Sequence, residues 1–306
     1  MSLQVHPETS LALAAAVVSG ALVAGQQRVN GDLSVLLGDA VLAAVVSFGT
    51  GLLLVVLVVC VRRSARGNVA GLRSIPWHWR LGGLGGASLV AAGAAAAPRI
   101  GVALFTVGLV AGTTLGGLAV DVVGLGPGDA QPVTGPRLAG AGLGLLAIVA
   151  TAAHGLRSAS PWLLLAVVLA GCLVSYQQAV NGRVRSETDA AVATLQNFVV
   201  GFTALVLGLA VRHALVGVHP ADWPGLDHWW LYLGGPMGAT FVAVAAVIVH
   251  RLGVLRLGLA VTAGQLVGGL VLDLDRGIAL STVVGATLAM AAVVVSGARS
   301  RTAVLP

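Results

Sequence analysis

Long runs of apolar residues, interrupted by short polar segments, dominate the chain from residue 11 to residue 296. A transmembrane helix needs about 20 mostly apolar residues, because the hydrocarbon core of a bilayer is roughly 30 Å thick. Ten stretches qualify, some of them short or closely joined: 11–29, 40–61, 79–97, 100–120, 138–153, 161–180, 190–211, 229–249, 252–272 and 281–296. The pattern therefore predicts an all-α integral membrane protein with ten transmembrane helices.

Two of these stretches follow their predecessors so closely that each pair must form a tight hairpin. Little more than Pro98-Arg99 separates the third from the fourth, and His250-Arg251 separates the eighth from the ninth. The first stretch lacks a preceding basic segment and a convincing cleavage site, so we expect a retained helix there instead of a removed signal peptide.

Composition supports the membrane class. Of the 306 residues, 57% are hydrophobic and only 9% are charged, whereas soluble domains carry about 25% charged residues. The net charge of +6 does not indicate nucleic-acid binding, because the 17 basic residues are all arginines that lie mainly between apolar runs. Cys60 and Cys172 have no metal-ligand spacing around them, and we expect no metal site, no cofactor and no catalytic residue.

The arginines also predict an orientation, because cytoplasmic loops of membrane proteins are enriched in Arg and Lys. With the N-terminus inside, 12 of the 17 arginines face the cytoplasm and five face the opposite side. Both termini are then cytoplasmic, in a multi-pass protein of a bacterial-type inner membrane. All six tryptophans fall near predicted helix ends, as the aromatic belt of a membrane protein requires.

An internal repeat divides the chain. Residues 26–31 (QQRVNG) recur as residues 177–182 (QQAVNG), and residues 99–121 align without gaps on residues 251–273 with 9 identities in 23 positions. A composition this biased would give roughly three identities by chance, so the excess indicates duplication. The offset between matched residues stays between 150 and 152, and we call two residues related in this way repeat mates.

The repeat predicts the architecture. Residues 1–156 form a first five-helix repeat and residues 157–306 a second, within a single transmembrane domain. Because five is odd, the second repeat enters the membrane in the opposite orientation, as inverted repeats do. Two inverted copies can exchange conformations, so inward-open and outward-open states become close in energy, with a substrate site between the halves near the midplane.

Several motifs carry a family resemblance. They are the paired Gln-x-x-x-Asn-Gly elements, the Phe-x-x-Gly elements at Phe48 and Phe198, and the run from Gly264-Gln265 to Asp273. Over residues 12–296 the chain resembles the drug/metabolite transporter superfamily, in the branch of inner-membrane exporters with a duplicated five-helix unit. The resemblance implies a ten-helix transporter of small solutes with both termini inside. Gly112-Thr113 stands where the second half has Gly264-Gln265, so the halves would contact a substrate unequally.

Uncharged polar side chains inside the predicted helices are the candidate substrate-binding groups, because a polar group in hydrocarbon needs a partner. The candidates are Gln26, Gln27, Asn30, Thr113, Gln177, Gln178, Asn181, Asn197 and Gln265. They suit a neutral or zwitterionic solute. The alternative is hydrogen bonding between helices. For the two Asn-Gly pairs we favour a third interpretation, a left-handed turn that ends the helix.

Asp121 and Asp273, repeat mates at helix ends, are candidates for proton coupling. A carboxylate partly withdrawn from water binds a proton more readily, and the two would do so on opposite sides. The alternative, which we favour, is a hydrated residue at the interface. No Asp or Glu occupies the centre of a predicted helix and aromatic residues are sparse, which argues against proton-driven export of lipophilic cations.

These patterns favour a secondary-active or facilitative transporter, an exporter of a small metabolite or drug-like solute by alternating access, without enzymatic activity. The alternative is a membrane-embedded binding or assembly subunit that does not transport. The expected partners are a small-molecule substrate and the lipid bilayer. Gly108, Gly112 and Gly116 form a small-residue face that supports either a compact bundle or a homodimer contact.

Overall fold

The computed structural model describes residues 7–127, 130, 134–152, 161–217, 222–272 and 280–297. The long helices are α1 (Pro7–Leu37), α2 (Ala40–Val61), α4 (Gly83–Val123), α5 (Gly135–Ala152), α6 (Pro161–Glu187), α7 (Ala190–Val216), α8 (Gly234–Leu272) and α9 (Leu280–Gly297). The short helices are α3 (Arg63–Asn68), η1 (Val69–Ser74), η2 (Trp77–Gly82) and η4 (Leu226–Tyr232). The predicted all-helical class is confirmed for the described residues.

The outer surface of the bundle is apolar. Leu53 of α2 and Leu207 and Leu215 of α7 are 71%, 62% and 78% exposed. Within the described residues, five helical segments are long and apolar enough to cross a membrane: α1, α2, α6, α7, and α8 together with η4. Since such a surface is stable against lipid and not against water, the chain is a multi-pass membrane protein.

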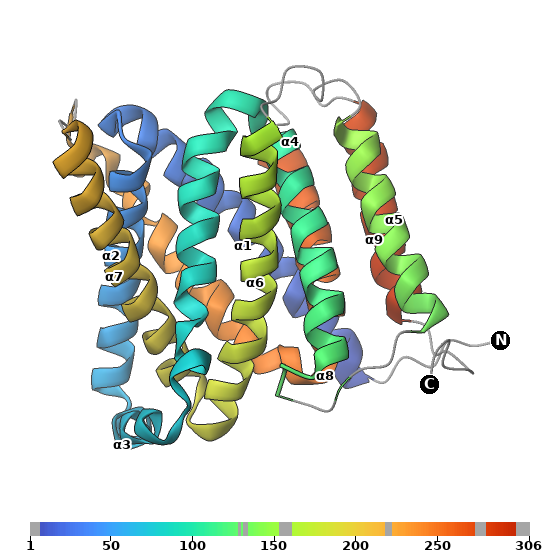
Figure 1. Ribbon diagram of the computed structural model, residues 1–306, viewed down its shortest axis with the longest axis horizontal. Helices are drawn as coiled ribbons and strands as arrows, with labels where there is room; N and C mark the ends of the chain where they lie inside the picture. Colours follow the sequence, from blue (N-terminus) through green and yellow to red (C-terminus); the bar gives the residue numbers. More distant parts are fainter. Residues whose placement is uncertain are drawn as a thin grey trace.

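Two helices are too long for one crossing. α4 has 41 residues and α8 has 39, so each would extend about 60 Å if straight. Figure 1 shows α4 bent into two limbs, and Pro98 lies near its middle, where a proline removes a backbone hydrogen bond and clashes with the preceding turn. α8 breaks at Gly253, whose φ of 72° favours glycine. Each closely joined pair of predicted stretches is thus one bent helix.

The prediction that the Asn-Gly pairs end their helices is wrong. Asn30-Gly31 and Asn181-Gly182 lie inside α1 and α6, which continue to Leu37 and Glu187. Neither glycine is among those with positive φ, whereas Gly38, just after α1, has a φ of 67°. The two asparagines meet residues of the other half of the chain, as described below, and so have no capping role.

The helices pack in pairs that join the first half to the second. α1 lies along α8, α4 along α6, α2 against α7 and α5 against α9. The pair α5 and α9 stands together at one side of the bundle (Figure 1). Helices related by the repeat take equivalent places: α1 corresponds to α6 and α4 to α8, so the α1–α8 pair is repeated by the α6–α4 pair.

Glycines permit the close approach in these pairs. A Cβ atom at Gly264 would lie 1.8 Å from the carbonyl oxygen of Val17, and one at Gly112 would lie 2.0 Å from that of Val168. Gly112 and Gly264 are repeat mates, and so are Val17 and Val168. The same glycine contact therefore occurs twice, with the two halves exchanged, and the small-residue face of α4 serves packing within the bundle.

Candidate functional site

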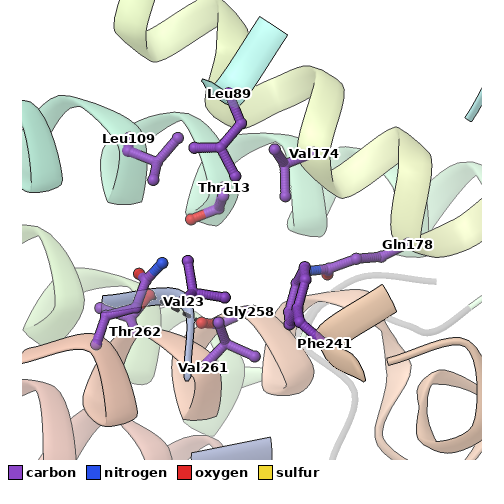
Figure 2. A pocket seen from close by; sticks show the side chains of 11 residues that line it. Val23, Leu89, Leu109, Thr113, Val174, Gln178, Phe241, Gly258, Val261 and Thr262 are labelled. Atoms are coloured by element: carbon purple, nitrogen blue, oxygen red, sulfur yellow. Dashed lines mark hydrogen bonds between the residues drawn. The ribbon is translucent and has the colours of Figure 1, made fainter. Parts of the chain in front are cut away.

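A small cavity lies between the two halves. Its lining comes from α1, α4, α6 and α8, and its volume is about 20 Å³. A cavity of roughly 10–15 Å³, counted as the space open to the centre of a water-sized sphere, can hold one water molecule. In this conformation the cavity therefore accommodates a group about the size of one water molecule. Figure 2 shows Leu89, Leu109 and Thr113 on one side of the cavity and Phe241, Val261 and Thr262 on the other.

Most of the lining consists of repeat mates that face each other. The pairs are Val23 with Val174, Leu89 with Phe241, Leu109 with Val261, and Thr113 with Gln265. The ring pair of Phe48 and Phe198, also repeat mates, stacks at 5.0 Å between centroids elsewhere in the interface. When a residue and its mate line the same cavity, the two halves contribute equivalent positions to it. The cavity therefore lies where matched parts of the two halves meet.

Of the described residues that line the cavity, four are polar and uncharged, namely Thr113, Gln178, Thr262 and Gln265, and none is charged. Three of them, all except Thr262, are sequence-predicted candidates. The hydroxyl of Thr113 donates to the carbonyl oxygen of Val110 and that of Thr262 to the carbonyl oxygen of Gly258. Gln178 is 3% exposed, and its Oε1 is buried without a hydrogen-bond partner among the described residues.

The other predicted amides meet glycines of the opposite half. A Cβ at Gly82 would lie 2.5 Å from Oδ1 of Asn181, and one at Gly234 would lie 2.1 Å from Oδ1 of Asn30. In the same way Gln177 approaches Gly85 and Gly86 at the start of α4, and Gln26 approaches Gly238 at the start of α8. All four amides are buried, and each closes the interface between halves in place of lining the cavity.

One pair of amides forms an asymmetric contact. Nδ2 of Asn181 donates to Oδ1 of Asn197 over 2.8 Å, and both residues are buried. The repeat mates are Asn30 and Ser47, whose polar side-chain atoms are buried without partners in the described part of the chain. The predicted residue Asn197 therefore stabilises the contact between α6 and α7, and this hydrogen bond exists in one half only.

Gln27, the mate of Gln178, lies one helical turn beyond the cavity. It stands four residues after Val23 on α1, and its amide packs near Gly93 and Phe105. Gly93 and Phe105 are themselves one turn away from the lining residues Leu89 and Leu109. Gln27 thus occupies the space next to the cavity, and the repeat is broken at the cavity itself, since Gln178 reaches it and Gln27 does not.

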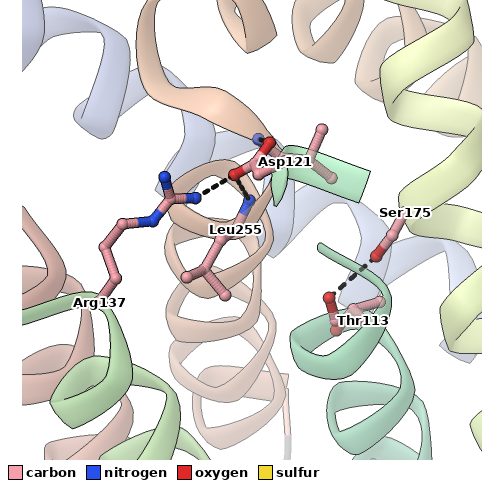
Figure 3. Close-up of polar contacts among 6 residues, drawn as sticks. Thr113, Asp121, Arg137, Ser175 and Leu255 are labelled. Carbon is pink, nitrogen blue, oxygen red and sulfur yellow. Dashed lines mark hydrogen bonds and ion pairs between the residues drawn. The ribbon is translucent and has the colours of Figure 1, made fainter. Parts of the chain in front are cut away.

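Asp121 is buried, so the expectation of a hydrated residue at the interface is wrong. It is 4% exposed at the end of α4. Its carboxylate accepts hydrogen bonds from the N–H groups of Val254 (2.8 Å) and Leu255 (3.1 Å), which begin the second limb of α8, and forms an ion pair with Arg137 of α5 (Figure 3). Backbone N–H groups at the start of a helix are good donors to an anion. We call this contact the Asp121 clasp.

Further cationic groups surround the Asp121 clasp. Arg256 lies close enough to Asp121 and Arg137 to interact with both charges. Arg183 of α6 donates to the carbonyl oxygens of Gly124 (2.6 Å) and Leu125 (2.7 Å), just after α4, while its guanidinium lies 4.7 Å from the ring centre of Trp79. The ends of α4, α5 and α6 and the break in α8 are thus joined at one place.

Sequence reasoning did not find Arg137 or the apolar part of the cavity. In the sequence, Arg137 is only one of the 12 arginines predicted to face the cytoplasm. Leu109 and Val261 lie one turn before the mates Thr113 and Gln265, so the i−4 spacing was an available signal. Asp273, the mate of Asp121, lies outside the described residues. The described residues contain no group of three or more His, Cys, Asp or Glu side chains that could hold a metal ion.

Comparison with known proteins identifies a matching family. A family model described as "Putative inner membrane exporter, YdcZ" matches residues 11–150 and again residues 162–298. Eleven chains of solved structures match. One of them, titled only "Crystal structure of protein", is 22% identical with a TM-score of 0.66, over 93% of this chain and 94% of that chain. At this identity the likeness shows the fold alone. No curated protein matches.

Proposed function

The chain belongs to the family of inner membrane exporters that the YdcZ model describes, and from this premise we propose that it is a secondary-active or facilitative transporter. It exports a small metabolite or drug-like solute by alternating access between its two halves. The cavity where matched parts of the two halves meet is the substrate site in a closed conformation. The observation that carries the proposal is that repeat mates from both halves line this one cavity.

The position of the cavity matters because of how inverted repeats work. If the halves exchange their conformations, a site lined by matched parts of both halves keeps the same lining while its access changes from one side of the membrane to the other. A volume of about 20 Å³ is too small for a metabolite, so substrate binding requires the halves to move apart. Transport and binding then depend on the same motion.

The proposed topology has ten crossings, with residues 1–156 and 157–306 as inverted five-helix repeats. Counting the bent helices α4 and α8 as two crossings each gives five crossings per half. The odd number inverts the second half. The end that carries α3, η1 and η2 faces the cytoplasm in this proposal, because Arg62, Arg63, Arg66, Arg73 and Arg80 lie there. Both termini are then cytoplasmic.

Proton coupling through Asp121 and Asp273 is a separate element of the proposal. In this conformation the carboxylate of Asp121 is occupied by Arg137 and by the N–H groups of Val254 and Leu255. In the proposed coupling, Arg137 and the start of the second α8 limb move away from Asp121 when it exchanges a proton. Coupling in this form ties protonation to the opening of the Asp121 clasp. Without proton coupling, the concentration gradient of the solute itself drives its transport.

The test of alternating access needs no substrate. In a background with Cys60 and Cys172 replaced by alanine, Thr113→Cys places a thiol at the cavity, and a membrane-impermeant maleimide is added to either side of sealed vesicles. We expect labelling from both sides, slower than at an exposed position. Arg66→Cys and Arg212→Cys serve as controls, which we expect to be labelled from opposite sides. Labelling of Thr113→Cys from one side only contradicts alternating access, and labelling of both controls from one side contradicts the inverted topology.

A further inference from the structure

The polar groups at the cavity include hydrogen-bond acceptors that have no donor of their own to bind within the described part of the chain. Thr113 and Thr262 already donate their hydroxyl protons to the carbonyl oxygens of Val110 and Gly258, so only their lone pairs face outward. Gln178 adds Oε1, an acceptor that is buried without a partner among the described residues. Gln265 is the fourth polar group, and the side-chain amides of both glutamines can donate as well as accept. Satisfying the unpartnered Oε1 of Gln178 and the two hydroxyl oxygens, however, requires a ligand group that donates.

The apolar part of the lining restricts the rest of the ligand. Leu89 and Leu109 on one side and Phe241 and Val261 on the other present hydrocarbon and one aromatic ring to the cavity. A carboxylate or phosphate would meet the acceptor oxygens of Gln178, Thr113 and Thr262, which repel it, and an ammonium group would find no counter-charge among the described residues that line the cavity. Burying either charge without a partner is strongly unfavourable. An uncharged donor avoids both penalties.

The size of the cavity agrees with a ligand that has one polar donor group and a larger apolar body. In the closed conformation about 20 Å³ is available, which suits a single hydroxyl or amino group and not the body of a solute. The polar group would occupy this space first, and the apolar body would fill the space that appears between Leu89 and Phe241 as the halves separate.

We infer that the site selects uncharged, amphipathic solutes that present a hydroxyl or N–H donor to Gln178, Thr113 and Thr262, with an apolar body against Leu89 and Phe241. The inference rests on the proposed function, because it assigns the substrate class of the same cavity. If recognition depends on a hydrogen bond donated by the ligand, methylating the donor group abolishes the preference for that ligand. This holds even though methylation makes the ligand larger and more hydrophobic. Gln178 determines this specificity, since its mate Gln27 lies outside the cavity.

The experiment uses matched probes on the purified full-length protein. Benzyl alcohol is compared with benzyl methyl ether, and benzamide with N,N-dimethylbenzamide, with benzoate as the anion. Apparent affinity comes from the shift of the thermal unfolding midpoint with probe concentration. Because aromatic probes also partition into detergent micelles, each shift is read as the difference from the Gln178→Leu variant. We expect each donor probe to bind about tenfold more tightly than its methylated partner, and benzoate to give no specific shift.

Two further variants keep the result interpretable. Thr262→Val removes a hydroxyl that bonds only to its own helix, so it serves as the cavity variant if Gln178→Leu fails to fold. Gln196→Leu changes a glutamine outside the cavity, whose Nε2 donates to the carbonyl oxygen of Arg80, and must retain the preference. Equal binding of the methylated probes, tight binding of benzoate, or no specific shift with any probe overturns the inference. Alternating access, measured by thiol labelling, is judged independently of these outcomes.

Discussion

Asp121 of α4 and Arg137 of α5 form a buried ion pair, with side chains that are 4% and 6% exposed. The same carboxylate accepts from the N–H groups of Val254 and Leu255 on α8. One side chain thus joins three helices, of which α4 and α5 belong to the first half of the chain and α8 to the second. This end of the interface opens only if the Asp121 clasp breaks.

Replacing Asp121 by asparagine leaves Arg137 buried without its counter-charge. Removing one partner of a buried ion pair destabilises a protein by about 3–5 kcal/mol, and we expect Asp121→Asn to lower the stability of the purified protein by that amount. The matched control is Asp32→Asn, because Asp32 pairs with Arg28 on the surface with 54% and 37% of the side chains exposed. Such pairs contribute less than about 1 kcal/mol. Equal losses in the two variants would contradict the buried role of Asp121.

A double variant separates the pair from the rest of the Asp121 clasp. Arg137→Met removes the second charge while keeping a flexible apolar side chain, so Asp121→Asn combined with Arg137→Met should recover part of the stability that Asp121→Asn loses. Thermal unfolding of all four forms gives the coupling energy, which we expect to exceed about 1 kcal/mol. Additive losses would show that the two side chains act independently.

The sequence predicted much of this architecture and missed the Asp121 clasp for physical reasons. Hydropathy determines which segments cross lipid, so the helical class follows from composition, and the joins at Pro98 and near Gly253 follow from the spacing of apolar runs. The burial of Asp121 depends instead on where α5 returns after the loop, and its contact with Val254 spans more than 130 residues. No local pattern encodes a contact of that kind.

The glycine contacts predict a position-dependent effect of adding one methyl group to α8. Gly264→Ala would place a Cβ 1.8 Å from the backbone oxygen of Val17, whereas Gly269→Ala meets nothing within 4 Å. Overpacking of this kind destabilises by about 1–3 kcal/mol, and we expect Gly264→Ala to do so and also to slow transport. Gly269→Ala should be neutral or stabilising by up to about 1 kcal/mol, because alanine favours a helix. Thermal unfolding of the two variants measures the difference in their stabilities. An unchanged stability of Gly264→Ala would contradict the close packing of α8 against α1.

The asymmetry of the buried amides predicts different effects at two repeat mates. Asn197→Ala removes the acceptor of the 2.8 Å hydrogen bond from Asn181 and leaves a buried donor unpaired, which is unfavourable by about 1–3 kcal/mol. Ser47→Ala removes a hydroxyl that has no partner in the described part of the chain, so we expect a change within about 0.5 kcal/mol. Chemical denaturation of both variants measures the difference. A larger loss for Ser47→Ala than for Asn197→Ala would be inconsistent with the hydrogen bonding seen here.

The positions of the buried amides also show why the sequence identifies polar residues as candidates but does not reveal which of them line the cavity. Helical periodicity shows that Gln26 shares a face with Asn30 and Gln177 with Asn181, and the structure places both faces at the interface between halves. Periodicity does not show which helix lies opposite. Gln177 and Gln178 are adjacent, yet one meets glycines of α4 and the other reaches the cavity.

Gln265 gives the most direct test of the cavity as the substrate site. It is half-buried in the lining, so Gln265→Ala removes a polar contact to the solute without breaking the helix packing. We expect the unfolding midpoint without solute to stay unchanged, and affinity for the solute with the fastest counterflow in proteoliposomes to fall about fivefold. Gln196→Ala is the control, since that glutamine bonds to the carbonyl oxygen of Arg80 outside the cavity, and it should keep its affinity even if its stability falls. Unchanged affinity in Gln265→Ala would remove this residue from the site, because a hydrogen bond made to the solute cannot be lost without weakening its binding.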